Sequence, residues 1–129
     1  APANQTIMLG PRPEPAFAWL VVVAAPPGNR QIGLPMPVSM TAPTTIGRAN
    51  GNGITLQDNA CSAQHAKVRY ESVEEGVQSF VIYDLASSNG LYVGTKEDYK
   101  EETSRVYRKV LSDGDYLLIG ETTLVFKRI

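Results

Sequence analysis

The residues best suited to chemistry form a sparse, ordered series in the middle of the chain. The series runs Gly47-Arg48, Ser62-x-x-His65, Asp84-Leu85 and Ser87-Ser88-Asn89-Gly90. A guanidinium, hydroxyls and an amide are hydrogen-bond donors, and such donors are well suited to phosphate oxygens. Each motif lies beside short apolar runs and contains residues that favour turns. The sequence therefore predicts a group of phosphate-binding loops on a β scaffold.

The apolar runs between these motifs indicate short β-strands. Residues 17–24 are rich in β-branched and aromatic side chains, and residues 66–71 alternate between small or apolar and charged positions. No segment has a convincing helical period, because even the best candidate, residues 97–106, lacks repeating apolar positions. The expected strands are residues 17–24, 31–36, 44–46, 54–56, 66–71, 77–85, 91–93, 106–111, 116–119 and 123–126. Strands this short and closely spaced predict an all-β sandwich.

The connections between these strands carry their own signals. Asn89-Gly90 is the strongest hairpin signal in the chain, because a type I′ turn needs a positive φ at both central positions. Pro35 and Pro37 should confine their strand to a sheet edge, since proline lacks an N–H for the ladder. The polar residues 95–105 indicate a long exposed loop, and Gly120-Glu121 should close a final hairpin.

The length and the proline distribution suggest one folded domain with a lead-in. A chain of 129 residues is long enough to bury its own apolar core without a disulfide or a metal. Residues 1–15 contain several prolines and few apolar anchors, so we interpret them as a flexible lead-in or linker end. Residues 16–129 are then expected to form the domain.

Charge and cysteine content limit the possible partners and location. The formal net charge is −1, which argues against a broad basic surface for nucleic acid. The single cysteine, Cys61, cannot form an internal disulfide, so we expect a reducing, cytoplasmic setting. The uncharged stretch at residues 16–27 is too short to cross a bilayer, so we expect no membrane insertion by this segment.

The ordered set of motifs resembles the forkhead-associated (FHA) domain. Besides the central series, Gly114-Asp115 and Ile119-Gly120 stand at matching places near the end, and the match covers about residues 16–129. The resemblance implies an eleven-stranded β sandwich with recognition loops at one end. It also implies a non-enzymatic module that binds phosphothreonine in partner proteins, downstream of a Ser/Thr kinase, without a cofactor or metal.

Four residues match the family's ligand contacts. Arg48 matches the phosphate-binding arginine, whose planar guanidinium can donate two parallel hydrogen bonds to a phosphate. Ser62 matches a serine that also donates to the phosphate, and Ser88 matches a residue that contacts the phosphate or its flanking peptide. Asn89 matches the asparagine that hydrogen-bonds the main chain of the bound peptide.

Three further residues match positions that support the site. His65 matches a structural histidine that braces its loop from inside, while Gly47 and Gly90 are expected to satisfy backbone geometry rather than to contact the ligand. Three positions depart from the family pattern: Ala63, Leu91 and Gly94. The phosphate contacts remain, but the peptide preference does not follow from the family.

Two other classes of function compete with this interpretation. An enzyme would have to use Cys61 and His65, which lie on one loop without an evident third group, so we do not expect catalysis. No Cys/His cluster indicates a metal site. A β sandwich that binds partners without phosphate, through a sheet face or the acidic residues 95–105, is the main alternative.

Overall fold

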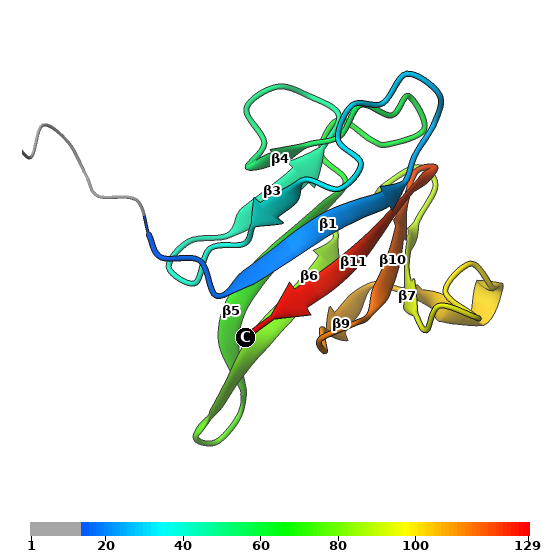
Figure 1. Cartoon of the computed structure of the whole chain (residues 1–129). Coiled ribbons are helices and arrows are strands. Elements are labelled where there is room, and N and C mark those ends of the chain that lie inside the picture. Colours follow the sequence, from blue (N-terminus) through cyan, green and yellow to red (C-terminus); the bar gives the residue numbers. More distant parts are fainter. Residues whose placement is uncertain (1–13) are drawn as a thin grey trace, which may run out of the picture.

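The computed structural model describes residues 14–129, and most of the predicted lead-in therefore lies outside the described part of the chain. Two sheets pack face to face (Figure 1). The first has the strand order β2-β1-β11-β10-β7-β8 and the second has the order β4-β3-β5-β6-β9. The prediction of an eleven-stranded β sandwich is confirmed. The strands are β1 (Ala18–Ala24), β2 (Pro35–Pro37), β3 (Thr44–Gly47), β4 (Ile54–Thr55), β5 (Ala66–Glu74), β6 (Val77–Asp84), β7 (Leu91–Gly94), β8 (Arg105–Val106), β9 (Arg108–Val110), β10 (Tyr116–Ile119) and β11 (Thr122–Arg128).

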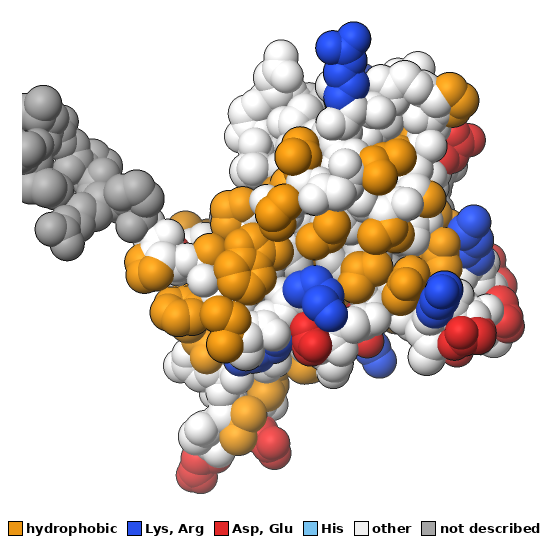
Figure 2. Space-filling model, in the orientation of Figure 1, with side chains coloured by type: hydrophobic (Ala, Val, Ile, Leu, Met, Phe, Trp, Pro, Cys, Tyr) orange, Lys and Arg blue, Asp and Glu red, His pale blue; other side chains and the backbone are white. Residues whose placement is uncertain are grey.

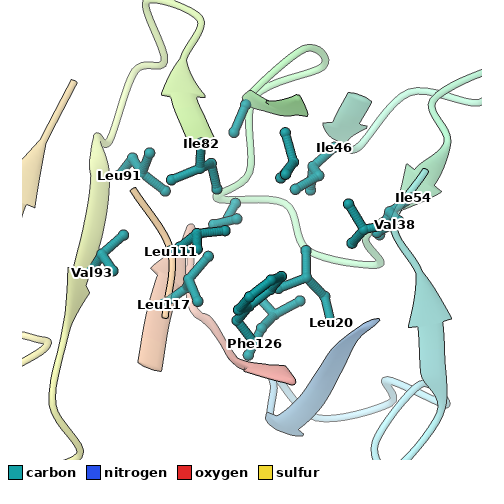
Figure 3. Packing of buried hydrophobic residues seen from close by; sticks show 14 of the residues in the cluster. Leu20, Val38, Ile46, Ile54, Ile82, Leu91, Val93, Leu111, Leu117 and Phe126 are labelled. Carbon is teal, nitrogen blue, oxygen red and sulfur yellow. The ribbon is translucent and has the colours of Figure 1, made fainter. Parts of the chain in front are cut away.

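Apolar side chains from the facing sides of both sheets form one core. Leu20 and Phe126 come from the first sheet and Ile46 and Ile82 from the second, and all four are fully buried (Figure 3). The rings of Phe80 and Phe126 meet across the sandwich with centroids 5.5 Å apart, within the range that aromatic pairs favour. Burial of this kind is the main force that holds the two sheets together.

Two sequence predictions about connections need correction. Asn89-Gly90 does not close a hairpin, because β6 and β7 belong to different sheets, and of these two residues only Gly90 has a positive φ, of 86°. Residues 106–111 do not form one strand, because the chain passes from β8 to β9, and so between sheets, at Tyr107. Residues 97–106 form no α-helix, as their lack of repeating apolar positions predicts, and contain the three-residue 3-10 helix η2 (Glu102–Ser104) and strand β8.

Other local predictions are confirmed. β2 is the edge strand that its two prolines require, although it is shorter than the predicted strand at residues 31–36. The turn at Gly120 joins β10 and β11 as an antiparallel hairpin. Most of the residues between β7 and β8 are exposed or half-buried, as expected of residues 95–105, but Ser104 is buried and donates to the carbonyl of Asp98 at 2.7 Å.

The register of the second sheet brings the predicted motifs to one end of the sandwich. Ile46 near the end of β3 pairs with Ala66 at the start of β5, and Ala66 pairs with Asp84 at the end of β6. The connections β3–β4, β4–β5 and β6–β7 therefore leave the sheet together. We call these three connections the loop end. The hairpin between β5 and β6 lies at the opposite end (Figure 1).

Candidate functional site

Arg48 immediately follows β3 and is exposed at the loop end. Its backbone N–H donates to the carbonyl of Ser62 at 2.9 Å, and its side-chain Nε donates to the carbonyl of Cys61 at 3.1 Å. These bonds hold the base of the side chain and the inner edge of the guanidinium against the β4–β5 connection. Among residues 14–129 no hydrogen bond occupies the two terminal nitrogens, so this fork is presented to solvent as a bidentate donor.

Ser62 connects Arg48 to the β6–β7 connection. Its Oγ accepts a hydrogen bond from the backbone N–H of Ser88 at 3.0 Å. Because the Oγ acts as acceptor in this bond, its own O–H remains available as a donor. The side chain is half-buried and Ser88 is exposed. The two predicted serines therefore lie together. Ser62 belongs to the β4–β5 connection that holds Arg48, and Ser88 is hydrogen-bonded to it.

Asn89 is exposed beside these serines and joins the β6–β7 connection to the β4–β5 connection. Its Nδ2 donates to the carbonyl of Ala60 at 2.7 Å, which uses one of the two N–H groups of the amide. The Oδ1 and the second N–H remain to pair with another main chain. The structure thus brings together all four residues that the sequence predicted as ligand contacts.

His65 is fully buried behind this cluster and braces it with both ring nitrogens. Nδ1 accepts from the backbone N–H of Ser62 at 3.0 Å, and Nε2 lies 2.7 Å from the carbonyl oxygen of Gly90. The imidazole must therefore carry its proton on Nε2, which donates to that carbonyl. His65 joins the β4–β5 and β6–β7 connections, which is the supporting position predicted for it.

The two predicted glycines are crowded for different reasons. A Cβ at Gly47 would lie 2.1 Å from the carbonyl oxygen of Ala63, so a side chain here would push two loops apart. Gly90 combines its positive φ with close neighbours, since a Cβ would lie 3.0 Å from Nε of Arg105. Close backbone approach at Gly47 and a left-handed conformation at Gly90 both require glycine.

Two further side chains, which the sequence did not single out, also hold the loops together. Nδ2 of Asn52 donates to the carbonyls of Ala49 and Ala63 at 2.7 and 2.9 Å, and so ties the β3–β4 connection to the β4–β5 connection. The carboxylate of Asp58, which is 4% exposed, accepts from the N–H of Glu121 and the hydroxyl of Thr122, both at 2.7 Å. An Asn between two glycines is a usable signal for such a bridge, whereas nothing near Asp58 in the sequence marks its distant partners.

An open pocket of about 540 Å³ lies beside Arg48. One wall is the β1–β2 connection, which is fixed to the end of β4 by amide side chains. Nε2 of Gln31 donates to the carbonyl of Thr55 at 2.6 Å, and Oε1 of Gln57 accepts from the N–H of Arg30 at 3.0 Å. The surface beside Arg48 is therefore hollowed, and these hydrogen bonds hold one wall of the hollow in place.

At two of the positions that depart from the family pattern, Ala63 and Gly94, neighbouring residues of the chain already use the backbone or fill the space. The carbonyl of Ala63 is used by the loop itself, through the bond from Asn52. A Cβ at Gly94 would lie 2.3 Å from Oδ1 of Asp98 and 2.9 Å from Oγ of Ser104. The chain after β7 therefore fills the space that a larger residue at position 94 would need.

The geometry gives Cys61 and His65 no catalytic relationship. Both nitrogens of His65 are bonded to the backbone, and the thiol of Cys61 donates to the carbonyl of Ser62 at 3.4 Å. Burial and the nearby Asp58 carboxylate raise the pKa of the Cys61 thiol to about 11, while Arg48 acts in the opposite direction. A thiol with this pKa is protonated at neutral pH and is a poor nucleophile. Within residues 14–129 no group of three or more His, Cys, Asp or Glu residues is arranged to hold a metal, and no helix of the described chain is long and apolar enough to cross a membrane.

The sequence of this chain is similar to parts of longer proteins. Glycogen accumulation regulator GarA of Mycolicibacterium smegmatis is 33% identical over 109 residues, which cover 84% of this chain and 58% of that protein. Mouse angiogenic factor with G patch and FHA domains 1 is 31% identical over 114 residues, which cover 87% of this chain and 15% of that protein. The chain therefore spans less than two thirds of these relatives.

Solved structures and a family model agree with these relatives. Mycobacterium tuberculosis EmbR, solved in complex with a low affinity phosphopeptide, is 31% identical with a TM-score of 0.61, and the match covers 88% of this chain and 24% of that one. The FHA domain of an Arabidopsis thaliana hypothetical protein shares the fold with a TM-score of 0.68 at 24% identity, covering 93% of this chain and 95% of that one. The model of the FHA domain family matches residues 44–120, more than half of the sequence. On these matches and on the arrangement of its loop end, the chain belongs to the FHA domain family.

Proposed function

We propose that this domain binds phosphothreonine in partner proteins through Arg48, Ser62, Ser88 and Asn89, and so acts downstream of a Ser/Thr kinase. The observation that carries the proposal is the pairing of the Arg48 guanidinium with the Ser62 hydroxyl. The first is fixed by its Nε bond and the second by its bond from Ser88. Donors that are held in place before binding lose little entropy when a phosphate arrives.

The chemistry of the cluster favours a dianion over a neutral ligand. A phosphothreonine carries about −1.5 to −2 charge at neutral pH and has several strong acceptor oxygens. Arg48 supplies a permanent positive charge and two parallel N–H groups, and Ser62 supplies an O–H. FHA domains are recognition modules, and this cluster offers donors for binding but no poised nucleophile. We therefore assign the domain no catalytic activity.

Asn89 suits the remaining part of the ligand. Its free Oδ1 and second N–H can pair with the two polar groups of a peptide main chain. Such pairing depends little on side-chain identity, so it holds the peptide without selecting its sequence. We propose a cytoplasmic location, which is compatible with the buried, unpaired Cys61.

Replacing Arg48 by alanine tests the proposal. Hydrogen bonds to charged groups contribute about 1.5–3 kcal/mol each, and a peptide bound at about 1 μM has only about 8 kcal/mol in total. Arg48→Ala should therefore abolish measurable binding of a phosphothreonine peptide selected from an oriented library, while the melting temperature changes little because the side chain is exposed. Calorimetry measures both quantities.

The control variant is Arg30→Ala, which makes the same change of charge on the neighbouring β1–β2 connection. It should bind the selected peptide nearly as tightly as the unmodified domain. The unphosphorylated peptide should bind far more weakly, since the donors would then lack an anion. Equal affinity of Arg48→Ala and the unmodified domain would rule out this site.

A second candidate function rests on the outer face of the first sheet. Trp19, Val21 and Val125 lie on this face, and Val23 near the end of β1 is 44% exposed. Figure 2 shows hydrophobic side chains spread across this face. A partner held there would bind without phosphate. Competition with a free phosphothreonine peptide separates the two functions, because it displaces a partner bound at the loop end only.

A further inference from the structure

Arg105 lies against the β6–β7 connection, although it is far from that connection in the sequence. It pairs with Tyr92 in the β7–β8 ladder, next to the pair between Leu91 and Val106. A Cβ placed on Gly90 would lie 3.0 Å from its Nε and 3.1 Å from its Cζ. The guanidinium therefore packs on the backbone of Gly90, the residue that follows Asn89.

The guanidinium of Arg105 also lies over an aromatic ring, that of Tyr107. Its Cζ lies 5.4 Å from the centroid of the Tyr107 ring, a distance typical of cation–π contacts. Tyr107 is 67% exposed, and its carbonyl accepts from the N–H of Asp84 at 3.0 Å. Since Asp84 ends β6, both Tyr107 and Arg105 stand at the loop end.

The charge of Arg105 has no counter-ion in the described part of the chain. The ion pairs found among residues 14–129 join Arg69 to Glu71 and Lys127 to Asp113. Nε of Arg105 is buried and has no hydrogen-bond partner. Glu102 of η2 instead accepts a hydrogen bond from the hydroxyl of Tyr92 at 3.3 Å. A guanidinium that is partly buried, packed against Gly90 and without an ion-pair partner is suited to a carboxylate supplied from outside.

Arg105 lies close enough to the proposed phosphate site for one bound peptide to reach both. Two residues span at most about 7 Å, so Gly90 lies within that distance of Ser88, and the Arg105 guanidinium is in contact with Gly90. Since Oγ of Ser62 lies 3.0 Å from the N–H of Ser88, the path from Ser62 to the Arg105 guanidinium over Ser88 and Gly90 is about 14 Å or less. An extended peptide advances about 3.3 Å per residue, so it covers this span in two to four residues.

We propose that Arg105, stacked on Tyr107, forms a second binding site for the carboxylate of an Asp or Glu two to four residues from the phosphothreonine. This inference rests on the proposed function, because it places the carboxylate on the same peptide. Arg48 supplies the phosphate contact and Arg105 selects the sequence beside it. The site gives the domain a preference for acidic partner sequences despite the departures from the family pattern.

The test is a double-mutant cycle between protein and peptide. Phosphothreonine peptides carry either Glu or Ser at each position from four before to four after the phosphothreonine, and their affinities are measured by fluorescence polarisation. The proteins are the unmodified domain, Arg105→Gln, Arg105→Lys and the control Arg108→Gln. Arg108 makes a similar contact with an aromatic ring, at 5.9 Å from Tyr83, and its replacement by Gln removes the same charge.

We expect Glu to improve affinity by roughly threefold to tenfold at one or more positions two to four residues from the phosphothreonine, as befits a partly exposed charged hydrogen bond. Arg105→Gln should erase this preference and leave the affinity for the Ser peptides within about twofold, and Arg105→Lys should keep only part of it because lysine lacks the planar fork. Arg108→Gln should keep the full preference.

Three results overturn the inference. The unmodified domain could show no preference for Glu at these positions, or Arg105→Gln could retain the preference, or Arg105→Gln could weaken Glu and Ser peptides equally, which is the result of a purely structural role at Gly90. Each of these leaves phosphate-dependent binding intact and is thus distinct from failure of the proposed function. Loss of all phosphate dependence in the unmodified domain would overturn both.

Discussion

At the loop end, side chains hydrogen-bond the backbone of other loops, whereas at the opposite end the β5–β6 hairpin is held by its own backbone ladder. Asn89 reaches Ala60 and Ser62 reaches Ser88 across more than twenty residues of sequence. In the hairpin, Ser72 reaches only Glu74, at 3.2 Å, and the turn at Gly76 is exposed with nothing near its Cβ position. The comparison shows that the shape of the loop end depends on a few individual side chains, whereas the shape of the hairpin does not.

The largest effect is expected at His65. His65→Ala removes the partners of the Ser62 N–H and the Gly90 carbonyl and leaves a cavity behind them. Each unsatisfied buried backbone group costs about 1–3 kcal/mol, and the cavity adds to this. We expect the free energy of unfolding to fall by about 3–5 kcal/mol in a urea titration, together with loss of phosphopeptide binding.

The matched change at the hairpin end is Ser72→Ala. It also removes a side-chain bond to a backbone carbonyl, but that carbonyl is exposed and water can replace the donor. The expected loss is below about 0.5 kcal/mol, as for most surface substitutions. If the two variants lost similar stability, the contrast between the two ends would be wrong.

A second contrast uses two glycines. Gly47→Ala places a methyl group 2.1 Å from the carbonyl oxygen of Ala63, and the backbone on both sides must move. Overpacking of this kind costs about 1–3 kcal/mol, and we expect the upper half of that range. Because Arg48 is the next residue, phosphopeptide affinity should fall as well.

Gly76→Ala provides the comparison. Its φ of 75° is unfavourable for alanine, at a cost of about 1 kcal/mol, but no neighbouring atom obstructs the methyl group. Stability should fall slightly and phosphopeptide affinity should not change. A loss of affinity in Gly76→Ala equal to that in Gly47→Ala would show that the two ends are coupled through the sheet.

Local sequence patterns were sufficient for features that depend on local chemistry. The strands around Leu20 and Ile82 follow from their apolar runs, and the turn at Gly120 follows from its neighbours. They were insufficient wherever the choice between sheets decides the outcome. Residues 106–111 have strand propensity throughout, yet Tyr107 separates strands of different sheets, because pairing with β7 and β6 is a long-range event.

The same division holds for the candidate site. Arg48 and Ser62 could be predicted because their motifs have characteristic neighbours and spacing. Arg105 could not, because its contact with Gly90 depends on how β8 pairs with β7. Asn89 was predicted as a ligand contact but its turn was predicted wrongly, since an Asn-Gly pair favours a hairpin locally and only the sheet topology excludes one here.

A third contrast between the two ends uses pH. Burial raises the pKa of Cys61 from 9.0 to about 11 in the folded state, and the unfolded thiol keeps its ordinary pKa. Between these two pH values the thiol of the unfolded chain has lost its proton, whereas the thiol of the folded chain retains it. The contribution of Cys61 to the free energy of unfolding is therefore fully present below pH 9 and is lost as the pH rises towards 11.

Each unit of pKa shift corresponds to about 1.36 kcal/mol, so the ceiling is about 2.7 kcal/mol, and we expect about 1–2 kcal/mol because other groups respond to the thiolate. Urea titrations from pH 8 to 11 measure this loss. Cys61→Ala removes the thiol and leaves every other ionisable group in place, so the difference between the two proteins isolates Cys61. The difference should grow with pH only above about 9. Parallel pH profiles would mean that water reaches the thiol, and hence that the interior of the loop end is as open as the hairpin.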